Sequence, residues 1–252
     1  MSSEAWFESW FDEDYLRLYE HRDEEEAELA VRNALLAAPE LGTGPVLDLA
    51  CGTGRHLEAL RRRNPLAFGL DLSSTLLSRA GEGLRPWLLR GDMRRLPVKA
   101  ASLSGLTLWF TPFGYFDDAG NRSTIQAIAG RLRPGGVFLL DYLNPAKVRA
   151  DLVPAERLDQ GGLEVDIQRS IEGNRIVKRM VIRVPGGGPT REVHESVRLY
   201  ELEEILGMAS DSRLRLRSAA GSYAGDPFGP GSPRWIGIFE LMPQWSPALE
   251  PS

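Results

Sequence analysis

The stretch that decides the fold is Val46-Leu47-Asp48-Leu49-Ala50-Cys51-Gly52-Thr53-Gly54-Arg55. An apolar segment runs into a turn of small residues, and a helical pattern starts near His56. Gly52 and Gly54 have no Cβ, so the chain can bend sharply and a ligand can lie against the main chain. The free N–H groups at the start of the next helix favour electron-rich ligand atoms. The stretch therefore predicts a strand, a ligand-binding turn and a helix.

Strand and helix patterns alternate after this turn. Helical stretches at 55–63, 73–82 and 121–132 separate apolar runs at 45–49, 66–71, 86–90, 104–110 and 136–142. Such alternation indicates βαβ units and a parallel sheet covered on both faces. Ligands of these sheets bind outside the carboxyl ends of the strands, so we expect the site there. Between 160 and 200 the period becomes that of half-exposed strands, which indicates an inserted antiparallel β-meander.

The composition limits the classes of function. The chain has 252 residues, 42% of them hydrophobic and 26% charged, which is typical of a soluble globular protein. Its acidic N-terminal segment does not have the pattern of a signal peptide, and no apolar run is long enough to cross a bilayer. The single cysteine, Cys51, fits a reducing cytoplasm. A net charge of −5 disfavours nucleic acid as a partner, and the lack of a long apolar run predicts no membrane contact.

The glycine spacing separates two ligand classes. A dinucleotide fingerprint, G-x-G-x-x-G, needs a third small residue at position 57, where this chain has Leu57. Positions 48–54 instead follow D-x-A-x-G-x-G, which resembles the first motif of class I S-adenosylmethionine-dependent methyltransferases, with Ala50 in place of the usual first glycine. The resemblance implies S-adenosylmethionine as the cofactor and S-adenosylhomocysteine as its product, with cofactor contacts from Asp48, Ala50, Cys51, Gly52 and Gly54.

Carboxylates also follow the second and third apolar runs. Asp71 ends the second run and precedes Leu72, and a carboxylate at such a strand tip can accept both hydroxyls of a ribose. We expect Asp71 and Leu72 to contact the cofactor. Gly91-Asp92-Met93 follows the third run and resembles the adenine-binding element of the same family. The resemblance implies that Asp92 accepts the exocyclic amine and that the Met93 backbone N–H reaches a ring nitrogen.

Two further runs resemble elements of this family. Residues 132–140 are similar to the L-[RK]-P-G-G element before the fifth strand. Residues 109–116 are similar to an N-S-F-G-Y-F run of small-molecule methyltransferases, with Thr111-Pro112 in place of Asn-Ser. The sequence has no [DN]-P-P-[YF] run, which argues against a DNA enzyme that methylates amino groups. In the family the second run lies beside the reactive methyl, which implies cofactor contacts from Trp109 and Phe110 and acceptor contacts from Phe113 and Tyr115.

The N-terminal segment is unusually aromatic for a chain end, so we expect its rings to pack. In related small-molecule enzymes an arginine before the first long helix pairs with the cofactor carboxylate, and aromatic residues cover it. The resemblance implies this role for Arg22, a guanidinium being well suited to a carboxylate, and a covering role for Tyr19.

Sulfonium methyl transfer needs alignment of the acceptor and exclusion of water, and a base only where the acceptor must lose a proton. Tyr115, Tyr142 and His194 are the candidate bases, and none is chosen among them. The residues expected to contact the acceptor are Phe113, Tyr115, Tyr142, Tyr223 and Arg234.

The resemblance implies a seven-stranded, doubly wound, Rossmann-like α/β methyltransferase sheet with a reversed last strand. Within this family, the chain is most similar to small-molecule enzymes such as glycine and sugar N-methyltransferases, and to methyltransferase domains of types 25 and 11. These enzymes carry an inserted β-meander. We expect an N-terminal helical cap at 1–38, a cofactor-binding core at 39–145 and 201–252, and a meander at 160–200 that forms the acceptor site or a dimer contact. The expected activity is methyl transfer to N or O of a small molecule.

Three other functions stay open. A nicotinamide-dependent oxidoreductase shares the Asp71 position, but Leu57 interrupts its fingerprint. A non-catalytic S-adenosylmethionine-binding protein would keep the cofactor residues and lack a productive acceptor site. An RNA or protein methyltransferase would use the same core, although the acidic balance disfavours RNA. A homodimer is an open expectation.

Overall fold

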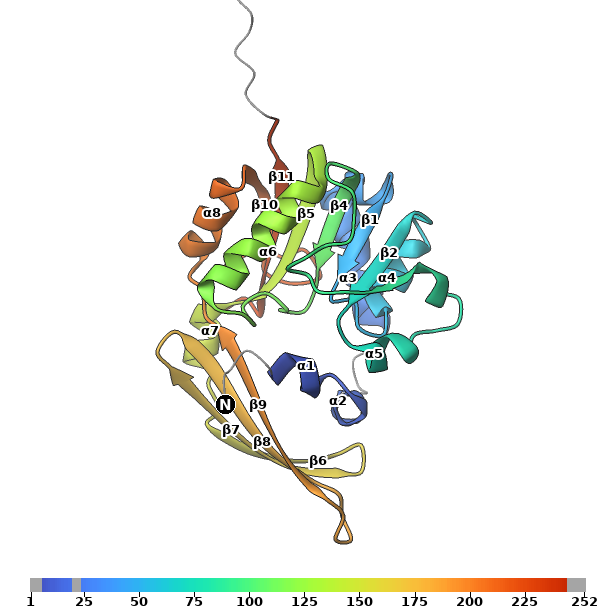
Figure 1. Cartoon of the computed structure of the whole chain (residues 1–252). Coiled ribbons are helices and arrows are strands. Elements are labelled where there is room, and N and C mark those ends of the chain that lie inside the picture. The colour runs from blue at the N-terminus through green and yellow to red at the C-terminus, as the bar shows by residue number, and fades with distance from the viewer. Residues whose placement is uncertain (1–5, 20–23, 244–252) are drawn as a thin grey trace, which may run out of the picture.

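A seven-stranded sheet forms the centre of the computed structural model, which describes residues 6–19 and 24–243 (Figure 1). The strand order is β10-β11-β5-β4-β1-β2-β3. All pairs from β3 to β5 are parallel, and β11 is antiparallel to both of its neighbours, which confirms the doubly wound sheet with a reversed strand. The strands are β1 (Val46–Leu49), β2 (Ala67–Asp71), β3 (Leu88–Arg90), β4 (Leu103–Leu108), β5 (Leu132–Leu143), β10 (Leu214–Ala220) and β11 (Arg234–Leu241).

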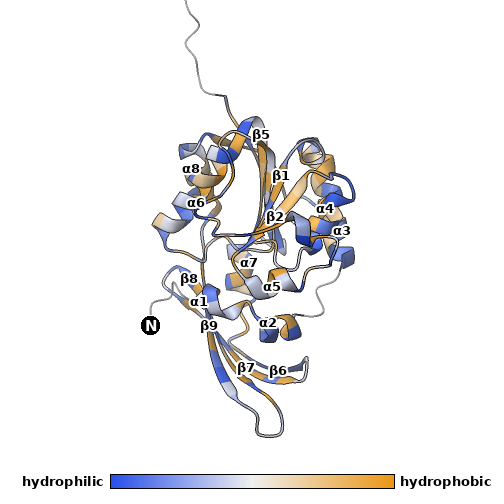
Figure 2. Cartoon of the chain, turned by 45° about the vertical axis from the view of Figure 1, so that its right-hand side comes forward, coloured by the Kyte–Doolittle hydropathy of each residue, from blue (hydrophilic) through white to orange (hydrophobic). Residues whose placement is uncertain are grey.

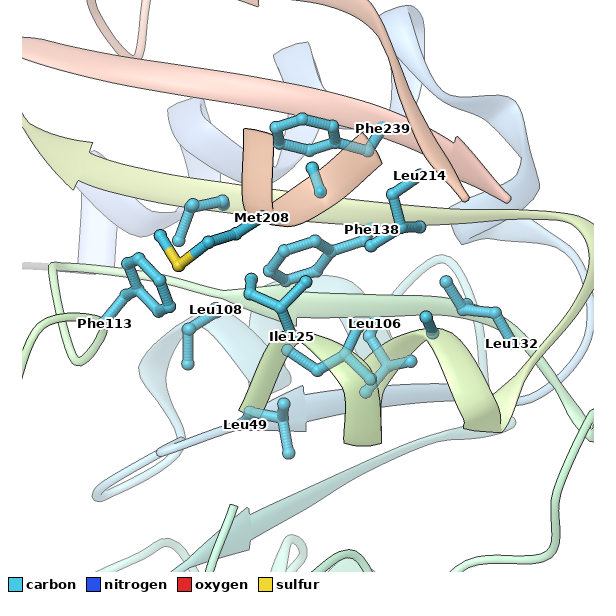
Figure 3. Close-up of a cluster of buried hydrophobic side chains, with 14 of the residues drawn as sticks. Leu49, Leu106, Leu108, Phe113, Ile125, Leu132, Phe138, Met208, Leu214 and Phe239 are labelled. Carbon is cyan, nitrogen blue, oxygen red and sulfur yellow. The ribbon is translucent and has the colours of Figure 1, made fainter. Parts of the chain in front are cut away.

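Helices cover both faces of this sheet, because side chains of its central strands are apolar on both sides. On one face α6 (Asp118–Arg131) and α8 (Leu202–Asp211) pack against β5, and Figure 3 shows Ile125, Phe138 and Met208 in that cluster. On the other face α3 (Glu24–Ala37) and α4 (Arg55–Arg61) pack against Val46 and Val137. Figure 2 shows hydrophobic residues gathered along β1 and β2.

Shorter helical segments connect these elements. They are α5 (Ser74–Ser78), α7 (Pro145–Ala150) and the 3₁₀ turns η1 (Pro39–Gly42) and η2 (Arg85–Trp87). The helix predicted at 73–82 is therefore shorter than expected. The helix predicted at 121–132 begins at Asp118, because the Asp117 side chain caps it by accepting the Gly120 backbone N–H at 2.7 Å. None of the helices in the described ranges is long and apolar enough to span a membrane.

A second, four-stranded antiparallel sheet follows β5 and α7, in the order β6-β7-β8-β9. Its strands are β6 (Ala155–Gln160), β7 (Leu163–Glu172), β8 (Arg175–Arg183) and β9 (Thr190–Arg198). The antiparallel insertion is confirmed, but β6 was not predicted because its six residues are mostly polar and lie on an edge. The proline and glycines of the L-[RK]-P-G-G element, which we expected before the fifth strand, lie within β5, where a register shift interrupts the pairing with β4.

Of the segment expected as a cap at 1–38, residues 6–19 lie between the two sheets in Figure 1 and are called the N-terminal cap below, whereas α3 packs on the large sheet. It contains α1 (Trp6–Trp10) and α2 (Glu13–Leu18), whose aromatic and aliphatic side chains share a buried cluster with β7, β8 and β9. The expectation that the N-terminal rings pack is therefore confirmed. On the core side Ser73 Oγ donates to the Phe11 carbonyl at 2.6 Å, and on the other side Arg191 Nη2 donates to the Ser9 carbonyl at 2.6 Å. The cap is thus fixed to both sheets.

Candidate functional site

A cavity of about 810 Å³ opens at the carboxyl ends of β1, β2, β3 and β4. The strand tips form one wall, and the N-terminal cap with β9 forms the opposite wall. This volume is that of a pocket for a small-molecule ligand. The position agrees with the rule that ligands of doubly wound sheets bind beyond the strand ends.

The glycine turn after β1 brings backbone to the cavity wall. Gly52 and Gly54 have φ values of 59° and 89°, which favour glycine, and a Cβ on Gly54 would lie 2.7 Å from Leu84. Ala50 has a φ of 51° although it carries a side chain. Ala50, Cys51 and Gly52 line the cavity, whereas Gly54 lies behind the wall as the N-cap of α4. Gly54 therefore shapes the turn rather than touching the cavity.

Asp71, at the tip of β2, is bound to this turn. Its Oδ2 accepts the Gly52 backbone N–H at 2.8 Å, and its Oδ1 accepts the Ser73 backbone N–H at 2.8 Å. Burial raises the pKa of Asp71 against the lowering effect of these two N–H groups. Each oxygen keeps further acceptor capacity toward the cavity, so the carboxylate can accept two hydroxyls.

Asp48, at the tip of β1, is buried and also lines the cavity. Thr107 Oγ1 donates to its Oδ1 at 2.8 Å. Burial, and to a lesser degree the charge of Asp71, raise the pKa of Asp48 to about 7. A cationic group in the cavity would favour the ionised form of Asp48, because opposite charges at short range stabilise each other.

Asp92 follows β3 at the far end of the strand tips and lines the cavity beside Met93. Arg94 pairs with it, with Nη2 2.7 Å from Oδ2. Burial alone would raise the pKa of Asp92, but the bonds from Arg94 outweigh it and hold the pKa below its usual range. The structure therefore brings three carboxylates to one wall, from the three strand tips at which the sequence predicted them.

Beyond the tip of β4, Trp109 stacks on His56, with the ring centroids 4.9 Å apart and the planes at 7°. Both side chains are buried and line the cavity, and neither Trp109 Nε1 nor His56 Nε2 has a partner among the described residues. Burial, then the charges of Arg55 and Arg234, hold the pKa of His56 well below its ordinary value, so the imidazole is neutral. These two nitrogens suit a polar ligand atom at this end of the cavity.

Phe110 and Thr111 adopt left-handed conformations that residues with a Cβ rarely adopt, with φ values of 63° and 67°. Both line the cavity. The Phe110 ring lies between two guanidinium groups, with Arg55 at 5.2 Å and Arg234 at 5.1 Å from its centroid. Arg55, which sequence analysis did not assign to the site, also lines the cavity and pairs with Glu26 at 2.9 Å.

Several residues predicted to contact the acceptor do not line the cavity. Phe113 and Tyr142 are buried in the core below the strand tips. The Tyr142 hydroxyl donates to the Arg198 carbonyl and accepts the Tyr200 backbone N–H at 3.1 Å, and burial raises its pKa. An acceptor or base role for Tyr142 is therefore not supported by its position, because its polar atom is engaged away from the cavity.

Tyr223 and Arg234 lie behind Phe110, where both bind Asp141 of β5. They support the tip of β4 and do not line the cavity. His194 is exposed on the face of β9 turned away from the cavity, since alternate residues of a strand point to opposite faces. Its position therefore does not support a catalytic role.

Tyr115 and Tyr19 do line the cavity, as do Leu72 and Met93. Arg22 lies outside the described residues. Sequence analysis expected an aromatic cover and a contribution from the meander, but it named few residues of the wall opposite the strand tips. That wall includes Trp6, Phe7, Phe11, Tyr15, Glu195 and Val197.

These residues fit an adenosyl cofactor with an amino-acid tail. Asp71 can accept a diol, Asp92 an exocyclic amine, and Asp48 favours a cationic group. The unpartnered nitrogens of Trp109 and His56 can meet the polar tail. Within the described part of the chain, no cluster of His, Cys, Asp and Glu could hold a metal ion.

Comparisons with known proteins agree with this chemistry. Residues 46–136 match a family model described as a methyltransferase domain. The dTDP-3-amino-3,4,6-trideoxy-α-D-glucopyranose N,N-dimethyltransferase of Streptomyces venezuelae is 31% identical over 157 residues, which are 60% of each chain. The match therefore spans less than two thirds of that relative. The dTDP-3-amino-3,6-dideoxy-α-D-glucopyranose N,N-dimethyltransferase of Streptomyces fradiae is 28% identical over 79% of this chain and 76% of its own length.

The fold is also that of a solved structure. An S-adenosylmethionine-dependent methyltransferase from Clostridium acetobutylicum matches with a TM-score of 0.78 over 91% of this chain and 97% of its own, at 20% identity. The likeness extends over both sheets of the present chain, because it leaves only a small part of the sequence unmatched.

Proposed function

We propose that this chain, a class I S-adenosylmethionine-dependent methyltransferase, transfers a methyl group to an amine nitrogen of a small-molecule acceptor. One observation carries the proposal: a single cavity joins the strand-tip carboxylates, Asp71 among them, to an aromatic wall that includes Tyr115. Such a cavity can hold a nucleoside ligand and a second molecule side by side. Both Streptomyces relatives are N,N-dimethyltransferases by name, which favours nitrogen over oxygen.

The residues that would hold the cofactor follow from the contacts described above. Asp71 accepts the ribose hydroxyls, Asp92 and the Met93 N–H bind the adenine, and Asp48 faces the cationic methionine end. When bound, S-adenosylmethionine supplies an electrophilic methyl carbon, whose bond to sulfur breaks as the acceptor nitrogen forms the new N–C bond. The protein contributes alignment and exclusion of water, because residues of the cap line the cavity opposite the strand tips.

The test has two parts. Isothermal titration with S-adenosylmethionine and S-adenosylhomocysteine should give one-site binding of each, and absence of both would refute the assignment. Mass spectrometry should then detect one or two added methyl groups on dTDP-3-amino-3,6-dideoxy-α-D-glucopyranose. The same sugar with a hydroxyl in place of the amine should stay unchanged, and its methylation in place of the amine's would contradict nitrogen transfer.

Binding without turnover across a panel of small amines would instead favour a non-catalytic S-adenosylmethionine-binding protein. A cytoplasmic location and a homodimer stay predictions. Fractionation of cells and light scattering of the purified chain test them separately.

A further inference from the structure

Glu195 is the one carboxylate that β9 directs into the cavity among the described residues. It lies between Val193, which packs in the cluster under the cap, and Val197, which also lines the cavity. The Glu195 side chain is 20% exposed. This carboxylate therefore lies on the wall opposite the strand-tip carboxylates Asp48 and Asp71, so the cofactor residues do not account for it.

Contacts from the cap and from β8 hold Glu195 in place. Trp10 Nε1 donates to its Oε1 at 2.6 Å, and Lys178 Nζ lies 3.7 Å from its Oε2. Lys178, which pairs with Glu195, also donates to the Tyr19 hydroxyl at 2.5 Å. A carboxylate can accept about four hydrogen bonds, so Glu195 keeps acceptor capacity toward the cavity.

Aromatic rings of the cap, together with Tyr115, line the same cavity as Glu195. Trp6 meets Tyr115 edge-on at a centroid distance of 4.7 Å, Phe11 stacks on Tyr115 at 5.9 Å, and Tyr15 lies 4.9 Å from Tyr19. All five rings line the cavity. Aromatic faces attract ammonium ions through the negative potential above the ring, and more strongly where water is excluded. A carboxylate beside such rings favours an organic ammonium over a neutral molecule of the same shape.

The same wall carries an unused hydrogen-bond donor. Trp6 is buried and lines the cavity, and its Nε1–H has no partner among the described residues. A buried donor without a partner is unfavourable, so a ligand oxygen that reaches Trp6 Nε1 would be favoured. The wall thus offers an acceptor, Glu195, and a donor, Trp6, which matches a molecule that carries both an amine and a hydroxyl.

We infer that Glu195, Trp6 and the aromatic rings beside them form the acceptor subsite, and that this subsite takes the protonated amine of a hydroxylated small molecule of the amino-sugar class. The inference rests on the proposed function and adds the residue that recognises the amine of the acceptor. It assigns Glu195 as the residue that binds the ammonium and removes its proton.

The proton balance of this assignment is simple. The R–NH₃⁺ group gives one proton to the Glu195 carboxylate and becomes R–NH₂ with a free lone pair. That lone pair forms the N–C bond, the electron pair of the C–S bond goes to sulfur, and the positive charge passes to the methylated nitrogen. Glu195 then releases its proton to water. A second methylation would need a second S-adenosylmethionine in place of S-adenosylhomocysteine, and the methylated ammonium would give a proton to Glu195 again.

The test uses the full chain saturated with S-adenosylhomocysteine, so that the strand-tip carboxylates are covered. Ligand-detected saturation-transfer NMR at neutral pH compares N,N-dimethylethanolamine, which is protonated, with 3-methylbutan-1-ol, its uncharged analogue of the same shape. We expect the amine to bind at least about tenfold more tightly than the alcohol. Equal binding of the two probes would overturn the inference.

Two variants assign the preference to Glu195. Glu195→Gln keeps an acceptor for Trp10 and removes the charge, and it should abolish the preference for the amine. Glu192→Gln, the same change on the exposed face of β9, should preserve it. If Glu195→Gln still prefers the amine, the inference is wrong.

Lys178→Met gives a second, independent measurement. It removes the cation that competes for Glu195, so it should tighten amine binding, and weaker binding would contradict the inference. Titration of each variant with S-adenosylhomocysteine reports on the cofactor half of the site. Failure of the inference with intact S-adenosylhomocysteine binding is therefore distinguishable from failure of the proposed function.

Discussion

The Phe110 backbone N–H donates to the Asp141 carboxylate at 2.7 Å, which joins the tip of β4 to the buried interior of β5. The same carboxylate pairs with Arg234 and accepts the Tyr223 hydroxyl at 2.5 Å. Phe110 and Thr111 hold left-handed conformations that cost about 1–3 kcal/mol each. The cavity wall at β4 is therefore kept in a strained shape by a carboxylate that does not itself line the cavity.

Replacing Asp141 by alanine should destabilise the protein by about 3 kcal/mol, because it leaves the Arg234 charge without its buried partner. Urea denaturation measures the change. Asp159→Ala, at an exposed position of β6, should stay within about 0.5 kcal/mol of the parent chain. Equal effects of the two changes would show that the Asp141 pair does not stabilise the fold.

Ala50→Gly should stabilise the chain. A residue with a Cβ in the left-handed region costs about 1–2 kcal/mol, while glycine adds about 0.5–1 kcal/mol of backbone entropy, so a gain of up to about 1.5 kcal/mol is expected. Ala127→Gly, in the right-handed helix α6, should destabilise by about 1 kcal/mol. If denaturation shows that both variants change the free energy of unfolding in the same direction, the assignment of strain at Ala50 is contradicted.

Because of the Asp48 carboxyl group, the free energy of unfolding should fall as the pH rises. Its pKa is about 7 in the folded protein against an ordinary value of 3.8, so the folded state binds more protons than the unfolded state between these values. The free energy of unfolding should therefore decrease from about pH 4 to about pH 7, by at most about 4 kcal/mol from this group. Asp48→Asn should flatten the profile, leaving the smaller part due to Asp71, whose pKa is also raised. An unchanged slope would contradict the prediction.

Arg191 should control the opening of the N-terminal cap. Its guanidinium pairs with Asp12 and with Asp14 at 3.4 Å, and donates to the Ser9 carbonyl at 2.6 Å. Arg191→Ala should accelerate amide hydrogen exchange in α1 and α2 by several-fold, because half-exposed ion pairs contribute about 1 kcal/mol or less. Arg183→Ala removes a pair with Asp166 on the same sheet and does not touch the cap, so it should leave that exchange unchanged. Similar amide exchange rates in α1 and α2 of both variants would contradict this role of Arg191.

The cofactor half of the site could be predicted from sequence because its requirements are local. The turn at Gly52 needs a left-handed backbone, and a carboxylate such as Asp71 lies at a strand tip that apolar periodicity locates. Strand order then brings the tips together, since successive βαβ units place parallel strands side by side.

The acceptor half could not be predicted in the same way. Glu195 enters the cavity only because the inserted sheet packs on the N-terminal cap, and that contact between distant segments leaves no periodic pattern. Tyr142 follows an apolar strand as Asp141 does, yet it shares the face of Phe138 and Leu140 and so turns into the core. A shift of one residue along a strand thus separates a core side chain from one that supports the cavity wall.

The most direct test of the account is the affinity of the chain for S-adenosylhomocysteine with and without the Asp71 carboxylate. Titration calorimetry should show one site in the parent chain. In Asp71→Asn the affinity should fall at least about tenfold, since each hydrogen bond to a charged group contributes about 1.5–3 kcal/mol. Asp159→Asn, an exposed change of the same kind, should bind as the parent does. Equal affinity in Asp71→Asn and the parent chain would contradict the claim that the strand tips hold the cofactor.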